Sequence, residues 1–218
     1  MRSGRRFWQP GVYHGGLFSF DWPPPLSAYS SLIACVGLPG SGKSTVGRQL
    51  ARRQGLRFVD SDQVIEQRLG CSIREFFERE GEVAFRDVEE QVLDELTQAG
   101  SGVLSTGGGA VLRPANRLRL HERTTTIYLH SSAEEVFKRL RHDQNRPLLQ
   151  VADPLGRLRE LYQVRDPLYR EAAHFVIETG RPSVASLVNM IIMQLELAGV
   201  NAPASAALPD SSAAHSSN

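Results

Sequence analysis

The clearest chemical signature in this chain is the segment 37–45, which reads GLPGSGKST and matches the phosphate-binding pattern G-x-x-x-x-G-K-[ST]. Gly40 and Gly42 leave room for backbone N–H groups to approach phosphate oxygens, and the N-terminus of a following helix adds partial positive charge. Lys43 would reach between the β- and γ-phosphates of a nucleotide, and the Ser44 hydroxyl would bind Mg²⁺. The alternative is a glycine-rich turn that only caps a helix.

A second group of reactive side chains is Asp60-Ser61-Asp62, which follows a short apolar run. If that run is a strand of a parallel sheet, both carboxylates lie at the carboxyl edge, where open α/β folds bind ligands. One carboxylate could hold the water shell of Mg²⁺ while the other receives or orients an acceptor hydroxyl. The competing interpretation is that Asp62 caps a helix starting near Gln63.

Three weaker signals suggest a small anionic substrate. Arg86 follows Phe85 on a predicted helix, three glycines occupy 107–109 after a predicted strand, and Arg165 lies in the segment RDPLY. Each alone has an ordinary explanation, as a solvated arginine or a tight turn. Together they supply two guanidinium groups and an exposed backbone, and arginine binds a carboxylate in a bidentate geometry that lysine cannot copy.

Charge and missing motifs narrow the class of nucleotide-binding protein. Lys and Arg number 25 against 24 Asp and Glu, a formal net charge of +1, so bulk charge gives no case for nucleic-acid binding. The guanine-recognition motif [NT]-K-x-D is absent from the sequence. GTPases and nucleic-acid motors are therefore disfavoured, and a kinase of a small molecule remains.

These residues require a framework, and the sequence alternates short apolar runs with amphipathic stretches, as in a parallel α/β sheet with covering helices. The apolar runs predict five strands, at 32–36, 57–60, 103–105, 126–129 and 175–177. The amphipathic stretches predict seven helices, at 44–54, 63–69, 73–79, 83–97, 133–141, 154–169 and 184–197. A polar loop is expected around 143–156.

The 218 residues suit one domain, which we place at 31–199 between an N-terminal extension at 1–30 and a C-terminal tail at 200–218. Both ends are expected to be disordered. The two cysteines, Cys35 and Cys71, have no close metal-ligand spacing, which fits a reducing cytoplasm and two small buried residues. No apolar run approaches the roughly 20 residues that span a bilayer, so no membrane association is expected.

The motifs taken together resemble those of the shikimate kinase family, in order and in spacing, from about residue 31 to residue 197. To the motifs above the resemblance adds the segments NRPLL at 145–149 and R-x-P-L-Y at 165–169. It implies a phosphate-loop kinase fold with five parallel strands in the order 2-3-1-4-5. A mobile lid and a helical substrate-binding segment are also implied.

The resemblance also implies a role for each matching residue. Asp62, Lys43 and Arg146 would be catalytic, with Arg146 closing from the lid. The nucleotide site would comprise Gly40, Ser41, Gly42, Lys43, Ser44, Thr45, Arg139, Arg146 and Arg181. The substrate site would comprise Asp62, Arg86, Gly107, Gly108, Gly109 and Arg165, and the metal would be held by Ser44 and Asp60. Arg86 and Arg165 would clamp the substrate carboxylate.

The implied activity is ATP-dependent and Mg²⁺-dependent phosphorylation of the 3-hydroxyl of shikimate, in the chorismate route to aromatic amino acids. The implied enzyme acts on a small molecule without nucleic-acid or membrane partners, as a cytoplasmic monomer. A kinase of another polyol acid such as gluconate is one alternative, and it would be indifferent to loss of Arg165. A nucleotide-binding regulator without catalysis is another.

Overall fold

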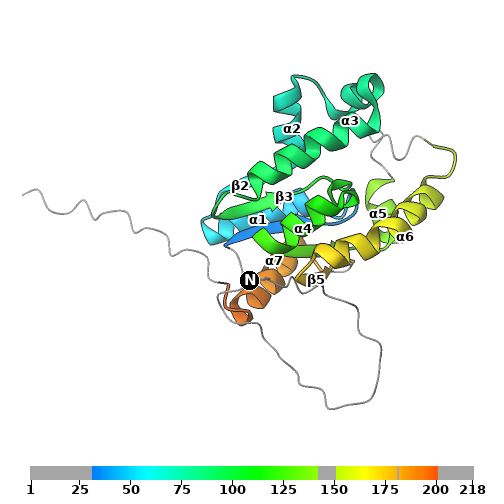
Figure 1. Cartoon of the computed structure of the whole chain (residues 1–218). Coiled ribbons are helices and arrows are strands. Elements are labelled where there is room, and N and C mark those ends of the chain that lie inside the picture. The colour runs from blue at the N-terminus through cyan, green and yellow to red at the C-terminus, as the bar shows by residue number, and fades with distance from the viewer. Residues whose placement is uncertain (1–30, 142–150, 181, 201–218) are drawn as a thin grey trace, which may run out of the picture.

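The computed structural model describes residues 31–141, 151–180 and 182–200. Five parallel strands form one sheet in the order β2-β3-β1-β4-β5 (Figure 1). The strands are β1 (Leu32–Val36), β2 (Phe58–Asp60), β3 (Gly102–Ser105), β4 (Thr125–His130) and β5 (Phe175–Glu178). The predicted sheet and its strand order are confirmed, and each predicted strand differs from the observed one by one residue at most at either end.

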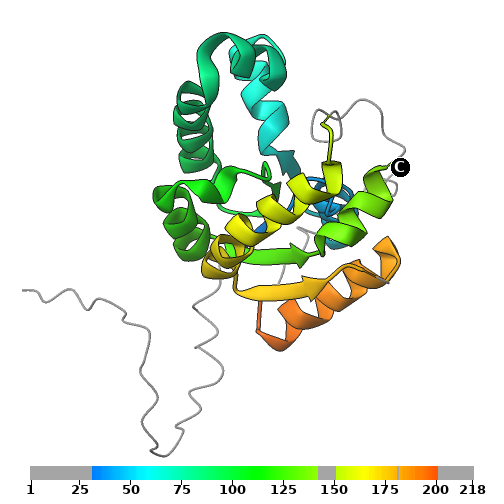
Figure 2. The same cartoon turned by 90° about the vertical axis from the view of Figure 1, so that its right-hand side faces the viewer.

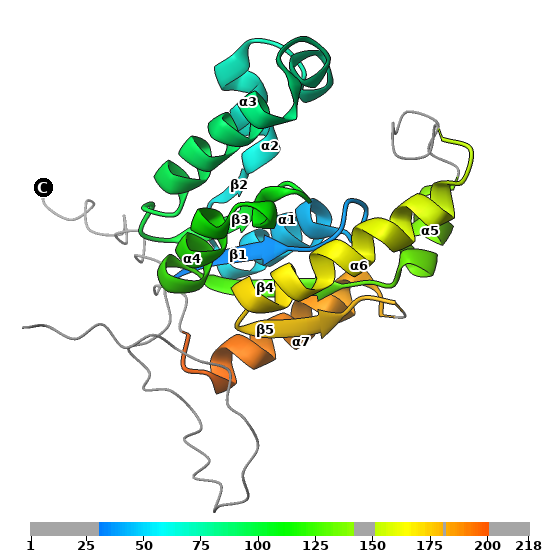
Figure 3. The ribbon, with the colours of Figure 1, turned by 45° about the vertical axis from the view of Figure 1, so that its right-hand side comes forward.

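Helices cover both faces of the sheet, as Figure 3 shows. On one face lie α3 (Ile73–Leu96), α4 (Pro114–Arg123) and α6 (Pro154–Ala172), and on the other α1 (Lys43–Gln54) and α7 (Val184–Leu197). The remaining helices are α2 (Ser61–Leu69), the 3₁₀ turn η2 (Ala110–Leu112) and α5 (Ala133–Leu140).

Side-chain alternation along β1 divides the core between the two faces. Ala34 and Val36 pack toward α4 and α6, whereas Ile33 and Cys35 pack toward α1 and α7. Every residue of β1 is buried because a central parallel strand has helices on both sides. The glycine-rich segment 37–45 begins directly after this buried strand, which therefore fixes its position.

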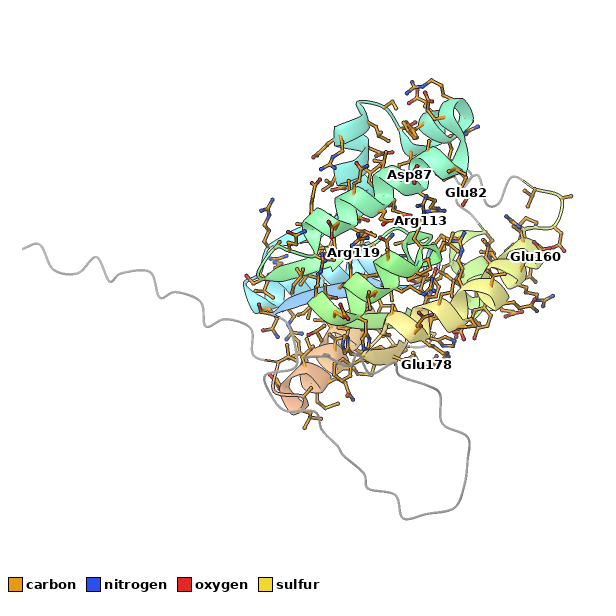
Figure 4. The ribbon with its side chains drawn as sticks, in the orientation of Figure 1. Glu82, Asp87, Arg113, Arg119, Glu160 and Glu178 are labelled. Carbon is orange, nitrogen blue, oxygen red and sulfur yellow. The ribbon has the colours of Figure 1, made fainter. Side chains whose placement is uncertain are left out.

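The helices α2 and α3 project from the sheet beside its carboxyl edge (Figure 2). Gly81 interrupts α3 with φ 81° and ψ 177°, a backbone conformation that L side chains rarely adopt. The two helices predicted on either side of this glycine are thus joined at a kink. Arg113 and Arg119 lie between α3 and α4 (Figure 4), where they form ion pairs with Asp87 and Glu90 of α3. These contacts hold the base of the projecting pair against the sheet domain.

The sequence patterns did not predict α4, and the small number of buried residues in this helix explains why. Within this helix only Asn116 and Leu120 are buried, while Leu118 is 57% exposed. A ten-residue helix with only two buried positions, one of them an asparagine, offers little apolar sequence to recognise. The start of α2 was also misplaced by two residues, because the capping residue is Asp60.

The two ends of the chain, residues 1–30 and 201–218, are predicted from the sequence to be disordered. Both lie outside the described residues. Val200, assigned to the tail by the sequence division, is buried and its N–H donates to the carbonyl of Leu195. Across the described ranges, no helix combines the length and apolar character needed to cross a bilayer.

Candidate active site

The chemistry-bearing segments predicted from the sequence meet at the carboxyl edge of the sheet. The glycine-rich segment follows β1, Asp60 ends β2, the three glycines follow β3, and Ser131 and Thr179 follow β4 and β5. Parallel strands bring their carboxyl ends to one edge, so residues far apart in the sequence become neighbours. The structure therefore assembles one site from five separate stretches of sequence.

The loop between β1 and α1 has the backbone that phosphate binding requires. Gly40 and Gly42 adopt φ of 83° and 96°, values that disfavour any residue with a side chain. Gly42 is the N-cap of α1, whose first-turn N–H groups have no partner within the helix and face the loop. The ammonium of Lys43 is buried and donates to the carbonyls of Gly37 (3.0 Å) and Leu38 (2.9 Å). The loop thus folds around its own lysine.

A cluster of hard oxygen atoms lies beside this loop. The Ser44 hydroxyl donates to Asp60 Oδ2 at 2.7 Å and lies 3.1 Å from the Ser105 hydroxyl. Oxygen donors of this kind suit Mg²⁺, which keeps several waters and uses one or two protein ligands together with phosphates. Among the described residues there is no group of three or more His, Cys, Asp or Glu that could hold a metal alone. The pair predicted from the sequence, Ser44 and Asp60, is brought together.

The carboxylates of Asp60 and Asp62, at the start of α2, make different contacts. Asp60 is the helix cap, because its side chain accepts from the backbone N–H of Asp62 at 3.1 Å. Asp62 therefore does not cap the helix, and its carboxylate faces Gly107. Burial, followed by the nearby charge of Asp60, raises the pKa of Asp62 to about 6, while Lys43 opposes this shift. A carboxylate with this pKa is a stronger base than an ordinary aspartate.

A cavity of about 570 Å³ opens between the sheet edge and the projecting α2–α3 pair. Every substrate-site residue predicted from the sequence lines it: Asp62, Arg86, Gly107, Gly108, Gly109 and Arg165. Apolar walls come from Pro39, Ile73, Phe77 and Phe85. Arg74, Glu78 and Glu89 also line it, so it holds three arginines and three carboxylates. Of these, Arg86 and Arg165 together with Asp62 suit a small ligand that carries both a carboxylate and hydroxyls.

The sequence reading missed Glu89, which lies one turn after Arg86 on α3. Glu89 is 1% exposed and accepts from Arg86 Nη1 at 2.6 Å. Glu82, one turn earlier, accepts from Arg86 Nε and Nη2 at 3.3 and 3.1 Å. Burial raises the pKa of Glu89, although Arg86 and then Arg165 oppose the shift. The glutamates hold the Arg86 side chain in the cavity, and the only sequence signal was their i,i+3 and i,i+4 spacing.

The three glycines after β3 are required by close packing, and their φ values are ordinary. A Cβ on Gly107 would lie 2.6 Å from Asp62 Oδ1, and one on Gly109 would overlap the Arg86 guanidinium. The Gly108 carbonyl accepts from Arg165 Nη1 at 3.0 Å and from the Tyr169 hydroxyl at 2.5 Å. Side chains from α2, α3 and α6 thus converge on this one bare stretch of backbone.

The remaining predicted residues concern the nucleotide. Arg139 donates to the hydroxyls of Ser131 (3.1 Å) and Thr179 (3.3 Å), so it lies where β4, β5 and the glycine-rich loop meet. The Ser41 hydroxyl is buried without a hydrogen-bond partner in the described part of the chain. Thr45, by contrast, is exposed on α1. Arg146 and Arg181 lie outside the described residues, as does the part of the predicted lid loop up to residue 150. The predicted loop ends earlier than expected, because α6 begins at Pro154.

A phosphate-binding loop between β1 and α1, a parallel sheet in the order 2-3-1-4-5 and an acceptor cavity beside it define the class of phosphate-loop kinases of small molecules. The particular family follows from comparison. The family model for shikimate kinase matches residues 39–196, and this chain belongs to that family.

Individual relatives agree with this assignment. The shikimate kinase of Paracidovorax citrulli is 66% identical over 174 residues, covering 78% of this chain and 95% of its own. That of Ralstonia nicotianae is 57% identical over 181 residues, covering 83% and 95%. Among solved structures, shikimate kinase from Acinetobacter baumannii in complex with shikimate matches with a TM-score of 0.74 at 44% identity, covering 79% and 98%.

Proposed function

We propose that this protein transfers the γ-phosphoryl group of ATP to the 3-hydroxyl of shikimate, giving shikimate 3-phosphate and ADP. The observation that carries the proposal is the cavity that joins Asp62 to the two arginines Arg86 and Arg165. Its shape and charge fit a ring that bears one carboxylate and several hydroxyls. Membership of the shikimate kinase family supports the same substrate.

In the proposed complex Arg86 and Arg165 bind the substrate carboxylate. Arg86 is already oriented by Glu82 and Glu89, so little side-chain entropy is lost on binding. The guanidinium of Arg165 is fixed against the Gly108 carbonyl. This clamp directs the hydroxyls of the ring toward Asp62, which accepts a hydrogen bond from the hydroxyl that is phosphorylated.

The nucleotide phosphates would lie in the loop between β1 and α1, where Lys43 exchanges its carbonyl partners for phosphate oxygens. The unpartnered Ser41 hydroxyl gains a phosphate partner there, and Arg139 lies on the adenine side. Ser44 and Asp60 would hold Mg²⁺, Asp60 through water, and the ion supplies neutralisation of phosphate charge. We assign the roles of Arg146 and Arg181 from the family pattern.

Catalysis in this proposal needs no covalent enzyme intermediate. Lys43 stabilises the negative charge that spreads over the transferred group, and the two sites hold donor and acceptor in line. Asp62 takes up the proton of the acceptor hydroxyl as the bond to phosphorus forms. Arg146, closing from the lid, adds positive charge and excludes water.

The pKa of Asp62 predicts how activity depends on pH. Because burial and Asp60 raise this pKa to about 6, the carboxylate is protonated and inactive in more acidic solution. We expect kcat/KM for shikimate to be level above pH 7 and to fall about tenfold per pH unit below the pKa. Initial rates between pH 5 and 8, with Mg-ATP saturating at each pH, measure this. A level profile down to pH 5 would contradict the assignment.

The packing of Arg86 against Gly109 predicts the effect of a small substitution. In Gly109→Ala the new methyl group would displace the Arg86 guanidinium, which is the mobile end of a long side chain. We expect KM for shikimate to rise about tenfold, with little change in KM for ATP or in Tm. Gly100→Ala is the matched control, because a Cβ at Gly100 has no atom within 4 Å. Equal KM values for the two variants would exclude this role of Arg86.

Replacing Arg165 separates shikimate from other polyol acids as substrate. Loss of a charge-assisted hydrogen bond costs about 1.5 to 3 kcal/mol, so Arg165→Ala should raise KM for shikimate about 10- to 100-fold. The KM for ATP should stay within about twofold. Steady-state kinetics with each substrate varied in turn measure both values. An unchanged KM for shikimate would reject the proposed clamp.

The cellular location and the oligomeric state of the enzyme are also part of the proposal. We assign it to the cytoplasm as a monomer without nucleic-acid or membrane partners, and its two cysteines, Cys35 and Cys71, are free thiols. Cys35 is buried in β1, as expected, whereas Cys71 is partly exposed. We also keep the disorder of residues 1–30 and 201–218 as a prediction.

A further inference from the structure

The helix that carries Arg165 contains a proline two residues further on. Pro167 lies inside α6 (Pro154–Ala172), and proline has no N–H to donate to the carbonyl four residues earlier. Its ring also crowds the carbonyl of Gln163. The turn that presents Arg165 is therefore not held by a complete ladder of helical hydrogen bonds, and contacts outside the helix must hold it.

Two tyrosine hydroxyls supply such contacts on either side of Pro167. Tyr128, a fully buried residue of β4, donates from its hydroxyl to Asp166 Oδ1 at 2.9 Å. Tyr169 donates to the Gly108 carbonyl at 2.5 Å. The acceptor of the Tyr128 bond, Asp166, is the residue next to Arg165. Neither Tyr128 nor Asp166 lines the proposed ligand cavity. This bond ties α6 to β4, the strand between β1 and the edge strand β5.

The ionisation states of Asp166 and Tyr128 favour the hydrogen bond between them. Burial works against ionisation of Asp166, but hydrogen bonds from Arg170 and Tyr128 lower the pKa of its carboxyl below the usual range. Burial and the same carboxylate raise the pKa of Tyr128 far above the usual range, so its phenol remains a donor. Arg170 Nε donates to Asp166 Oδ2 at 2.8 Å, and its guanidinium lies 5.8 Å from the centre of the Tyr128 ring.

Consecutive residues of an α-helix point about 100° apart, so fixing Asp166 also fixes the direction of Arg165. With Asp166 bound to β4, the Arg165 side chain reaches the Gly108 carbonyl at the cavity wall. A phenylalanine at position 128 would fill the same core space as the tyrosine ring. An apolar ring could therefore supply the packing of Tyr128, and its hydroxyl adds one directional hydrogen bond to Asp166.

We propose that Tyr128 and Asp166 are positioning residues for the reaction, because their hydrogen bond sets the rotation of α6 that aims Arg165 at the acceptor carboxylate. This inference rests on the proposed function, in which Arg165 binds that carboxylate. Neither residue touches the substrate, so their effect must pass through Arg165. The affected quantity is KM for shikimate, whereas kcat and KM for ATP depend on other residues.

The test is a double-mutant cycle with Tyr128→Phe and Arg165→Ala. Tyr128→Phe should raise KM for shikimate about fivefold, which corresponds to one hydrogen bond, with kcat and KM for ATP within about twofold. In the Arg165→Ala background the same change should have no further effect. Independent, multiplicative effects of the two changes would overturn the proposal, as would a normal KM in Tyr128→Phe.

Thr126→Val is the matched control, because this buried hydroxyl also lies on β4 but donates to the carbonyl of Leu120 on α4, at 2.9 Å. It should leave KM for shikimate unchanged, and a rise equal to that of Tyr128→Phe would overturn the proposal. Asp166→Asn, which keeps an oxygen acceptor for Tyr128, should have a smaller effect than Asp166→Ala. If Arg165→Ala itself leaves KM unchanged, the proposed carboxylate clamp fails, and this outcome is distinct from failure of the positioning bond alone.

Discussion

The variant Asp62→Asn should lose at least about 100-fold in kcat while its folded state becomes more stable at neutral pH. The loss in rate follows from removal of the group that orients the acceptor hydroxyl and takes up its proton, a contribution of about 10²- to 10⁴-fold. Asparagine has nearly the same shape, and among the described residues the backbone contact to Asp60 is made by the N–H of residue 62, which the substitution keeps. The active-site geometry should therefore survive.

The gain in stability follows from the raised pKa of Asp62. A carboxyl whose pKa is about 6 in the folded protein and 3.8 otherwise binds its proton more tightly when folded. Its contribution to the free energy of unfolding is present below pH 4 and is lost as the pH rises through about 6. At pH 7 the ionised group thus costs about 3 kcal/mol, and the neutral amide avoids this cost.

Thermal unfolding and kinetics of the same preparation measure both effects. At pH 7.5 the Tm of Asp62→Asn should exceed that of the unchanged protein by several degrees, and the difference should vanish near pH 4. Glu122→Gln is a control for the change from carboxylate to amide, since Glu122 is exposed on α4, away from the cavity. Near-normal kcat in the folded Asp62→Asn variant would refute the role given to this carboxylate.

The second large effect is expected for Lys43→Ala, which should lower kcat about 100- to 1000-fold. Removal of one preorganised charge or donor from a phosphoryl or oxyanion site typically costs this much. Lys43 is buried at 7% exposure, and its ammonium also donates to two carbonyls of the phosphate loop. The variant should bind ATP more weakly as well, because it lacks the ammonium that would exchange these carbonyls for phosphate oxygens.

The sequence provides a matched control for this variant. Lys43 and Lys138 are the only two lysines of the chain, and Lys138 is exposed on α5. Lys138→Ala changes net charge by the same amount and should keep nearly full activity. Coupled ADP-release assays and ATP titrations of both variants measure the difference. Equal activities would mean that the lysine of the loop has no part in the transfer.

The prediction of the fold succeeded where local patterns carry the information. The buried runs of β1 and β4 and the glycine-rich loop are continuous in sequence, so period and composition identify them. In the same way, Asp60 and Asp62 at the end of β2 implied a shared edge with the loop. What failed was α4, because this ten-residue helix buries only Asn116 and Leu120 and is held to α3 by ion pairs.

The sequence and the family resemblance predicted which residues line the cavity, but not the contacts between them. Glu89 was overlooked because an acid one turn from an arginine usually forms an exposed pair, whereas this one is 1% exposed. The role of Tyr169 at Gly108 depends on residues 61 positions apart in the chain. Only the folded sheet edge shows that the glycines are bare because Asp62 and Arg86 pack on them.

The most direct test of the proposed function is ADP release from Mg-ATP by the full chain with different acceptors. Shikimate, quinate, gluconate, a nucleoside monophosphate and no acceptor would be compared at equal concentration. We predict strong stimulation by shikimate and background rates with the other additions, because the chain belongs to the shikimate kinase family. Quinate and gluconate also carry a carboxylate and hydroxyls, so they test whether the cavity selects more than these two groups. Stimulation by gluconate in place of shikimate, or ATP binding without any stimulation, would contradict the proposed function.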